Sequence, residues 1–242
     1  MALIAICVHS TDENDRLKYT KECLESMLKT VDLNKHSLHI INNKSSLPTT
    51  EYLIDFVRNN NVGAFYNLKN NIGTAAGINL AIKERLPNQI VIKCDDDVVI
   101  HQSGWVEELE QAIIERPEIG ICGLRREDVY GNFMADGKFL FGDDIMGTCT
   151  AFNPKLLDKI GYMSQPSKYG FDDNLISVRS LVTGFKNCFL PHIKITHLDD
   201  GKNPYSDWKK KEAAMYLQEV SIMCDMYKSG KLNPYYDGGF ID

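Results

Sequence analysis

The sequence lacks several features that would point to particular classes of protein. It has no C-x-x-C pair, and its seven cysteines are scattered singly along 242 residues. Neither a zinc site nor a disulfide framework is therefore predicted, and unpaired thiols indicate a reducing compartment. No run of 18 apolar residues occurs, which predicts that no helix spans a membrane. The short apolar run at the start has no basic segment before it, so we expect no signal peptide and a cytoplasmic protein.

The sequence also has no excess of basic residues. It contains 27 Lys and Arg against 33 Asp and Glu, which gives a formal net charge of −6. Proteins that grip a nucleic-acid backbone usually show a basic excess, so this balance weighs mildly against that class. Repeats, low-complexity segments and an evident linker are missing too. The length and the ordinary hydrophobic content of 43% therefore favour a single α/β domain.

Along the first hundred residues, short apolar runs alternate with segments whose apolar residues recur at helical spacing. Strands are predicted at residues 3–8, 37–41, 62–68 and from 90, with helices at 17–30, 49–60 and 73–85 between them. This order indicates an open, mostly parallel sheet with helices on both faces. In the second half, the pattern predicts helices at 105–115, 154–160, 175–183 and 207–228, and strands at 119–124, 145–152, 186–190 and 193–196. Residues 125–144 are expected to form a hairpin or a mobile loop, and residues 165–173 a loop.

Three adjacent carboxylates, Asp95, Asp96 and Asp97, follow the apolar strand that starts at residue 90. Their mutual repulsion at the edge of a core costs stability unless a cation offsets it. Oxygen ligands suit Mg²⁺ or Mn²⁺, which usually bind through one or two carboxylates and substrate phosphates. The end of a sheet strand is also where ligands bind in open α/β folds. The alternative is an acidic turn that faces water.

Four further features recur in an order typical of one family. The segment N-I-G-T-A-A-G-I-N covers residues 71–79, and M-G-T-C-T-A-F covers 146–152. The segment Y-G-F-D-D-N-L-I-S-V-R covers 169–179, and His197 follows a late apolar run. Together with the acidic triplet as a D-x-D motif, these features resemble the inverting family-two glycosyltransferases of the GT-A fold. The resemblance extends over residues 3–197 and implies a Rossmann-like sheet with a small acceptor-side sub-sheet.

The resemblance implies a donor site and a metal site. By position, the contacts to a nucleoside-diphosphate sugar would come from Ser10, Asp12, Asn42, Asn43, Asn71, Gly73, Gly77, Asn79, Asp95 and Asp96. A Mn²⁺ or Mg²⁺ ion would be held by Asp97, Asp95 and His197. The family commonly has Asp-Asn where this sequence has Asn42-Asn43, so the identity of the base stays open. A lone histidine such as His197 can also be structural, and His192 is a nearby competitor.

The resemblance also assigns the chemistry at the acceptor. Gly147 and Thr148 would lie on the acceptor side, and Asp173 would be the general base beside Asp172. The base is needed because the acceptor hydroxyl has to lose its proton as it attacks the anomeric carbon. Helical spacing would let Arg179 orient a carboxylate. The sequence departs from the family at Leu175, where a second Asp is usual, and at Asn153, where Arg is frequent.

The sequence thus predicts a metal-dependent glycosyltransferase that acts with inversion. Residues 1–100 would form the nucleotide-binding half of one domain, 101–200 the acceptor half, and 201–242 a C-terminal helix and tail. The acceptor could be a glycan, a lipid-linked glycan, a protein or a modified nucleobase in DNA. A nucleotidyltransferase or a nucleotide-binding protein without transferase activity remains an alternative. Neither of those requires the late pair of Asp173 and His197.

Overall fold

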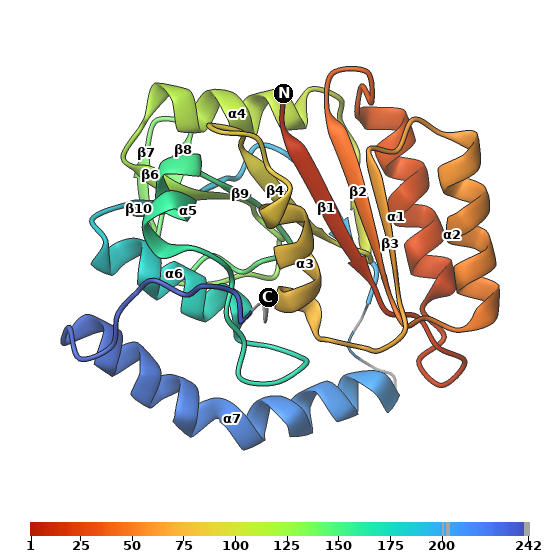
Figure 1. Cartoon of the computed structure of the whole chain (residues 1–242). Helices are drawn as coiled ribbons and strands as arrows, with labels where there is room; N and C mark the ends of the chain where they lie inside the picture. The colour runs from red at the N-terminus through yellow and green to blue at the C-terminus, as the bar shows by residue number, and fades with distance from the viewer. Residues whose placement is uncertain (200, 202–203, 240–242) are drawn as a thin grey trace.

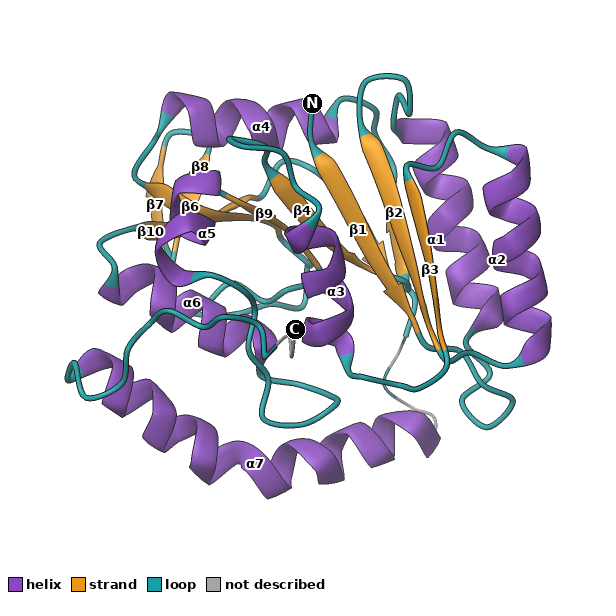
Figure 2. Ribbon diagram, in the orientation of Figure 1, coloured by secondary structure: helices purple, strands orange, loops and turns teal. Residues whose placement is uncertain are grey.

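The computed structural model describes residues 1–199, 201 and 204–239. A sheet of nine described strands crosses the molecule in the order β3-β2-β1-β4-β9-β6-β10-β8-β7, with helices on both of its faces (Figures 1 and 2). Parallel pairing joins β3, β2, β1 and β4, and also joins β6 with β10, whereas β9 runs antiparallel between β4 and β6. A second sheet contains β5 and β11. The predicted mostly parallel α/β sheet with a small sub-sheet is therefore confirmed.

The elements follow the sequence pattern closely. The strands are β1 (Leu3–Val8), β2 (Ser37–Asn43), β3 (Ala64–Leu68), β4 (Val91–Asp95), β5 (Val98–Ile100), β6 (Ile119–Leu124), β7 (Met134–Asp136), β8 (Phe139–Phe141), β9 (Cys149–Phe152), β10 (Lys186–Leu190) and β11 (Ile195–His197). The helices are α1 (Leu17–Thr30), α2 (Leu47–Asn59), α3 (Thr74–Lys83), α4 (Trp105–Glu115), α5 (Pro154–Ile160), α6 (Asp172–Val182) and α7 (Pro204–Lys228).

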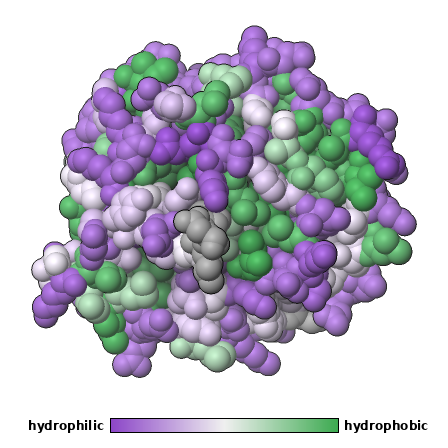
Figure 3. All heavy atoms as spheres, in the orientation of Figure 1, coloured by the Kyte–Doolittle hydropathy of each residue, from purple (hydrophilic) through white to green (hydrophobic). Residues whose placement is uncertain are grey.

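The main sheet is buried on both faces, which explains why its strands read as continuous apolar runs. In β1, Ile4 and Ile6 pack into the core that α1, α2 and α4 cover, whereas Leu3 and Ala5 pack under α3 and α5. Helix α7 lies along the lower edge of the molecule, below α6 (Figure 1). On the face shown in Figure 3, apolar side chains gather near the middle, and polar side chains cover most of the rim.

The sheet has a topological switch point between β1 and β4. From β1 the chain proceeds outward to β2 and β3, and it then returns to the other side of β1 to form β4. The crevice beyond the carboxyl ends of two such strands is where open α/β sheets bind ligands. The acidic triplet begins at Asp95, the last residue of β4, and therefore lies at this crevice.

Two local predictions need correction, and one open alternative is decided. The sequence predicts a loop at residues 172 and 173, but they form the first turn of α6, where carboxylates are favoured by the helix dipole. Strand β5 directly follows the triplet and was missed because it is only three residues long. Within 125–144, the hairpin alternative is the one found, as β7 pairs with β8.

No helix among the described residues has the length and apolar character needed to cross a membrane. Residues 240–242 of the predicted tail lie outside the described part of the chain.

Candidate active site

A cavity of about 430 Å³ lies at the switch point, where β1 and β4 end. Its walls come from the end of β1, the end of β4, the segment before β9, the start of α6 and the first half of α7. The predicted site residues that line it are Asp95, Asp96, Asp97, Gly147, Thr148, Asp172, Asp173 and His197. The fold thus brings the acidic triplet and the predicted base together from positions almost 80 residues apart.

Arg16 neutralises the acidic triplet from the side of α1. It is buried just before that helix, where its Nη2 donates to Asp97 Oδ2 and lies 3.5 Å from Asp96 Oδ1. Its Nη1 donates to Asp199 Oδ2 at 2.9 Å, and Thr20 Oγ1 donates to Asp96 Oδ2 at 2.9 Å. A fixed guanidinium therefore offsets much of the repulsion for which the sequence suggested a metal ion.

His197 reaches the triplet because β11 pairs with β5. The register sets His197 opposite Val98, and its Nε2 lies 3.3 Å from Asp97 Oδ2. Its Nδ1 lies 2.9 Å from the carbonyl oxygen of Asp199. Because a carbonyl only accepts, Nδ1 carries a proton and Nε2 is the nitrogen that faces Asp97. The sequence placed His197 after a strand, but the missed strand β5 is what brings it to the site.

The three predicted metal ligands do not converge on one point. Asp95 Oδ1 accepts from Lys93 Nζ at 2.8 Å, and Asp97 Oδ2 is shared by Arg16 and His197. Among the described residues, no group of three or more His, Cys, Asp or Glu side chains could hold a metal ion. One atom nevertheless remains available, because the buried Oδ1 of Asp97 has no hydrogen-bond partner in the described structure.

Asp173 is held by backbone N–H groups at the start of α6. Its Oδ2 accepts from the N–H of Gly147 at 3.0 Å, and its Oδ1 accepts from the N–H of Asn174 at 3.0 Å. The neighbouring Asp172 is buried, and its Oδ2 lies 3.5 Å from Lys93 Nζ. Lys93, a charged residue inside an apolar strand, therefore lies between Asp95 and the pair at α6.

The surroundings shift the pKa values of Asp97 and Asp173 in opposite directions, whereas burial raises those of Asp95 and Asp96. Burial disfavours the charged form of Asp97, but the hydrogen bond from His197 and the charge of Arg16 outweigh burial and hold the pKa of Asp97 well below its usual range. Burial raises the pKa of Asp173 to about 7, and repulsion from Asp172 adds to that effect. At neutral pH, Asp97 is therefore a permanent anion, whereas Asp173 can take up and release a proton.

Arg179 does not have the position that the sequence predicted. Its fully buried guanidinium donates to the carbonyl oxygens of Ile160, Tyr162 and Pro234, at 2.8 Å for Tyr162 and 2.6 Å for Pro234. It makes no hydrogen bond to Asp173 within the described structure, because the two side chains leave α6 on different sides. Arg179 instead ties the C-terminal tail to the end of α5, a structural role, and its catalytic role stays a prediction.

Several predicted donor residues make hydrogen bonds within the fold. Asn42 donates to Thr50 and Asn67, and Asn43 donates to Asn71 and to the carbonyl of Gly73. These bonds join the end of β2 to α2, to β3 and to the loop before α3. The predicted donor residues that do not line the cavity are Ser10, Asp12, Asn42, Asn43, Asn71, Gly73, Gly77 and Asn79.

Two of those residues have clear packing roles. Asn79 exchanges two hydrogen bonds with the backbone of Met163, at 2.8 and 2.9 Å. Gly77 packs α3 against β1 so closely that an added Cβ would lie 2.6 Å from Cys7 Sγ. Both residues shape the cavity wall indirectly, through the helix and the loop that they fix.

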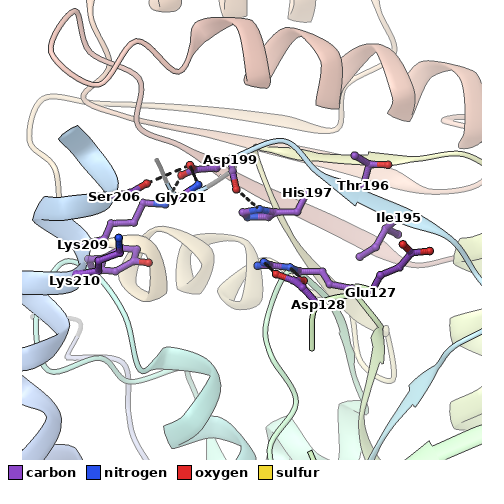
Figure 4. A pocket seen from close by; sticks show the side chains of 12 residues that line it. Glu127, Asp128, Ile195, Thr196, His197, Asp199, Gly201, Ser206, Lys209 and Lys210 are labelled. Carbon is purple, nitrogen blue, oxygen red and sulfur yellow. Dashed lines mark hydrogen bonds and ion pairs between the residues drawn. The ribbon is translucent and has the colours of Figure 1, made fainter. Parts of the chain in front are cut away.

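A second cavity, of about 570 Å³, adjoins the first and shares Arg126, Tyr169, His197 and Lys209 with it. Figure 4 shows His197 between the Asp199 side and the side of Glu127 and Asp128. The sequence did not predict Arg16, Lys93 or Arg126 as cationic residues of these cavities. Among these three, only Lys93 gave a signal, as a charge within an apolar segment.

Comparison with known proteins agrees with this geometry. The sequence model described as glycosyl transferase family 2 matches residues 5–165, about two thirds of the chain. The chain belongs to glycosyl transferase family 2. It is also 30% identical to protein L138 of Acanthamoeba polyphaga mimivirus, over 92% of this chain and 28% of that protein. The chain therefore spans little more than a quarter of the length of this relative.

Solved structures show that this family 2 chain has the GT-A fold. The mannosyltransferase PcManGT from Pyrobaculum calidifontis, in complex with GDP-Man and Mn²⁺, is similar with a TM-score of 0.69 and 14% identity, over 88% of this chain and 60% of that one. GalNAc-T7 with UDP, GalNAc and Mn²⁺ gives a TM-score of 0.66 and 15% identity, over 84% and 46%. TarS 1–349 of S. aureus with UDP-GlcNAc gives 0.59 and 16%, over 81% and 57%.

Proposed function

We propose that the protein transfers a sugar from a nucleoside-diphosphate sugar to an acceptor hydroxyl, with inversion and with Asp173 as the general base. The observation that supports this most is the shared cavity of the triplet and Asp173. An anionic diphosphate and a base for the acceptor are both needed within one site, and a nucleotidyltransferase would not need the second. Membership of glycosyl transferase family 2 supports the same reaction class.

The position of Asp173 suits proton abstraction. Two backbone N–H groups fix its carboxylate, and its pKa, which burial raises to about 7, lies near the pH of a cell. A general base is most effective when its pKa is close to the operating pH. Asp173 would accept the proton of the acceptor hydroxyl while that oxygen attacks the anomeric carbon from the face opposite the leaving diphosphate. The new glycosidic bond then has inverted configuration.

The leaving diphosphate would depart toward the cationic side of the cavity. Arg16, Arg126, His197 and Lys209 all line it there. Fixed positive groups aimed at developing negative charge are the usual means of stabilising such a leaving group. Arg16 and Lys209 are also joined through Asp199, to which both donate, at 2.9 and 2.7 Å.

The residues present also fit a divalent cation, although with fewer ligands than predicted. Asp97 Oδ1 is buried without a hydrogen-bond partner among the described residues, and His197 lies beside the same carboxylate. We propose Asp97 and His197 as the protein ligands for Mn²⁺ or Mg²⁺, since such ions commonly take one or two protein ligands and the substrate phosphates. When bound, the ion would supply further neutralisation of charge on the diphosphate.

A screen of nucleotide sugars tests the proposal. Wild-type protein is incubated with UDP- and GDP-sugars, with and without Mn²⁺, and the release of the nucleoside diphosphate is measured. We expect release with at least one sugar and stimulation by Mn²⁺. NMR of the glycoside formed with the active donor gives its anomeric configuration. A protein that neither binds nor cleaves any of these donors would contradict the proposed function, and a retained configuration would contradict inversion.

A further inference from the structure

Lys93 is buried, with a relative exposure of 4%, in the middle of β4. Its paired neighbours on the adjacent strands are Ala5 and Thr150, both small, which leave room for the lysine side chain. A buried ammonium costs several kcal/mol unless it is paired and hydrogen-bonded, so its partners are informative. Its Nζ donates to the carbonyl oxygen of Gly147 at 2.6 Å and to Asp95 Oδ1 at 2.8 Å. Both partners line the candidate active site.

Gly147 is held between the lysine and the proposed base. Its carbonyl oxygen accepts from Lys93, and its N–H donates to Asp173 Oδ2 at 3.0 Å. A Cβ added at this glycine would lie 3.1 Å from both Asp173 Cβ and Lys93 Nζ. The residue is therefore tightly enclosed, so loss of the bond to its carbonyl oxygen would free the residue to shift and would loosen the N–H that donates to Asp173.

We propose that Lys93 is a positioning residue that acts on Asp173 through Gly147. Its ammonium fixes the carbonyl of Gly147, and this fixes the N–H that orients the carboxylate of the base. The same ammonium holds Asp95 on the donor side, so one side chain sets the distance between the donor wall and the base. This inference rests on the proposed function for the role of Asp173, whereas the contact through Gly147 can be tested without any substrate.

Residue-selective NMR tests that contact. Met146-Gly147 is the single Met-Gly pair in the sequence, so labelling Met with ¹³C at the carbonyl and Gly with ¹⁵N gives one cross-peak, that of the Gly147 amide. We expect Asp173→Asn and Lys93→Met each to move this cross-peak, and Lys186→Met, an exposed lysine on β10, to leave it in place. An unchanged cross-peak in a folded Lys93→Met protein would overturn the proposal.

A kinetic comparison separates positioning from stability. Lys93→Met leaves Asp172 without its nearby ammonium, so the variant could lose stability for that reason alone. The double variant Lys93→Met/Asp172→Asn removes the orphaned charge, and Asp172→Asn alone is its reference. We expect the double variant to unfold closer to Asp172→Asn than Lys93→Met does, because the more buried of the two carboxylates that lose the ammonium is then neutral and only the half-buried Asp95 is left without it.

Turnover is read as release of nucleoside diphosphate from GDP-mannose and UDP-N-acetylglucosamine. We expect kcat of the double variant to be about 10²-fold lower than that of Asp172→Asn, the order of loss expected from a displaced catalytic group. Affinity for GDP or UDP should fall much less than kcat, although some loss is expected because Lys93 also holds Asp95 on the donor side. Equal kcat values for the double variant and Asp172→Asn would overturn the positioning role. If wild-type protein cleaves neither donor, the proposed function is contradicted for these sugars, and the Gly147 cross-peak alone decides whether Lys93 orients Asp173.

Discussion

Two acidic regions face the same cavity, and they differ in what surrounds them. At the end of β4, Asp97 lies against Arg16 and His197, and its pKa is held well below the usual range even though it is buried. At the start of α6, Asp173 is held by backbone N–H groups, and burial raises its pKa to about 7. In active sites where the pKa values of two carboxylates are shifted in opposite directions, the two carboxylates commonly have different roles. The comparison suggests a permanent anion for binding and a titrating group for proton transfer.

The largest expected effect comes from removing the titrating group. Asp173→Asn keeps the shape of the side chain but cannot accept a proton at neutral pH. We expect turnover to fall by about 10²–10⁴-fold, the usual contribution of a general base. Affinity for the nucleoside diphosphate, measured by calorimetry, should remain close to that of the wild type. Asp158→Asn, on the exposed side of α5, is the matched control and should retain full turnover. Normal turnover by Asp173→Asn would remove the base from the mechanism.

The second prediction concerns the permanent anion. Asp97→Ala removes the carboxylate that Arg16 and His197 share, so we expect the Mn²⁺-dependent part of nucleoside-diphosphate binding to disappear. His197→Ala should weaken the same binding less, by about 10-fold, because one ligand of several is lost. Calorimetry of UDP and GDP binding with and without Mn²⁺ measures both effects. If the Mn²⁺-dependent affinity for the nucleoside diphosphate persists in Asp97→Ala, Asp97 is not needed for metal-dependent binding, and the proposed difference in role between Asp97 and Asp173 is wrong.

The third prediction sharpens the contrast through pH. The base must be deprotonated to act, so kcat/KM should rise as pH increases and level off above about 7. Below that value, the rate should fall about tenfold per pH unit as Asp173 becomes protonated. Because repulsion from Asp172 contributes to the raised pKa of Asp173, Asp172→Asn should move the acidic limb of the pH profile of kcat/KM to lower pH. A limb that does not move, or that moves upward, would exclude this coupling.

Much of the fold follows from the sequence, because both faces of the main sheet are buried and its strands read as apolar runs. The positions of Asp95, Asp97 and Asp173 could also be predicted, since their motifs lie at the ends of elements. The cations that govern these carboxylates could not. Arg16 reaches Asp97 through tertiary packing across 81 residues of sequence, and no local periodicity encodes such a pair. Lys93 lies only two residues from Asp95, but its contact with the Gly147 carbonyl beside Asp173 spans 54 residues.

Hydrogen-bonding capacity explains why some predicted donor residues contact the fold and do not line the cavity. Asn42 and Asn43 have the polar character of ligand contacts, but loops without regular structure need side-chain partners for their backbone groups. Asn42 accordingly accepts from the N–H of Ser45, and Asn43 accepts from the N–H of Ile72. From sequence alone, a side-chain amide that hydrogen-bonds to loop backbone cannot be distinguished from one that would contact a nucleotide base, because both occur where a strand ends.

The smallest expected effect on chemistry, and a distinct effect on stability, concerns Arg179. Burial lowers its pKa to about 10, so it remains charged at neutral pH while it donates to the carbonyls of Ile160, Tyr162 and Pro234. Arg179→Met would leave those carbonyls without their donor, and we expect a loss of about 3 kcal/mol in the free energy of unfolding. Arg58→Met removes an exposed arginine that lies 3.8 Å from Asp55, and it should cost less than about 1 kcal/mol.

Urea unfolding measures both free energies, and nucleotide binding and turnover of the folded fraction complete the test. If Arg179 is structural, Arg179→Met lowers the unfolding midpoint while kcat per folded molecule and the pH limb of Asp173 stay as in the wild type. A kcat that falls about as far as in Asp173→Asn, with the unfolding midpoint unchanged, would instead restore the orienting role that helical spacing suggested. Such a result would mean that the guanidinium leaves its three carbonyls when substrate binds. It would also mean that Asp173, like Asp97, has a cation beside it when substrate is bound, namely Arg179.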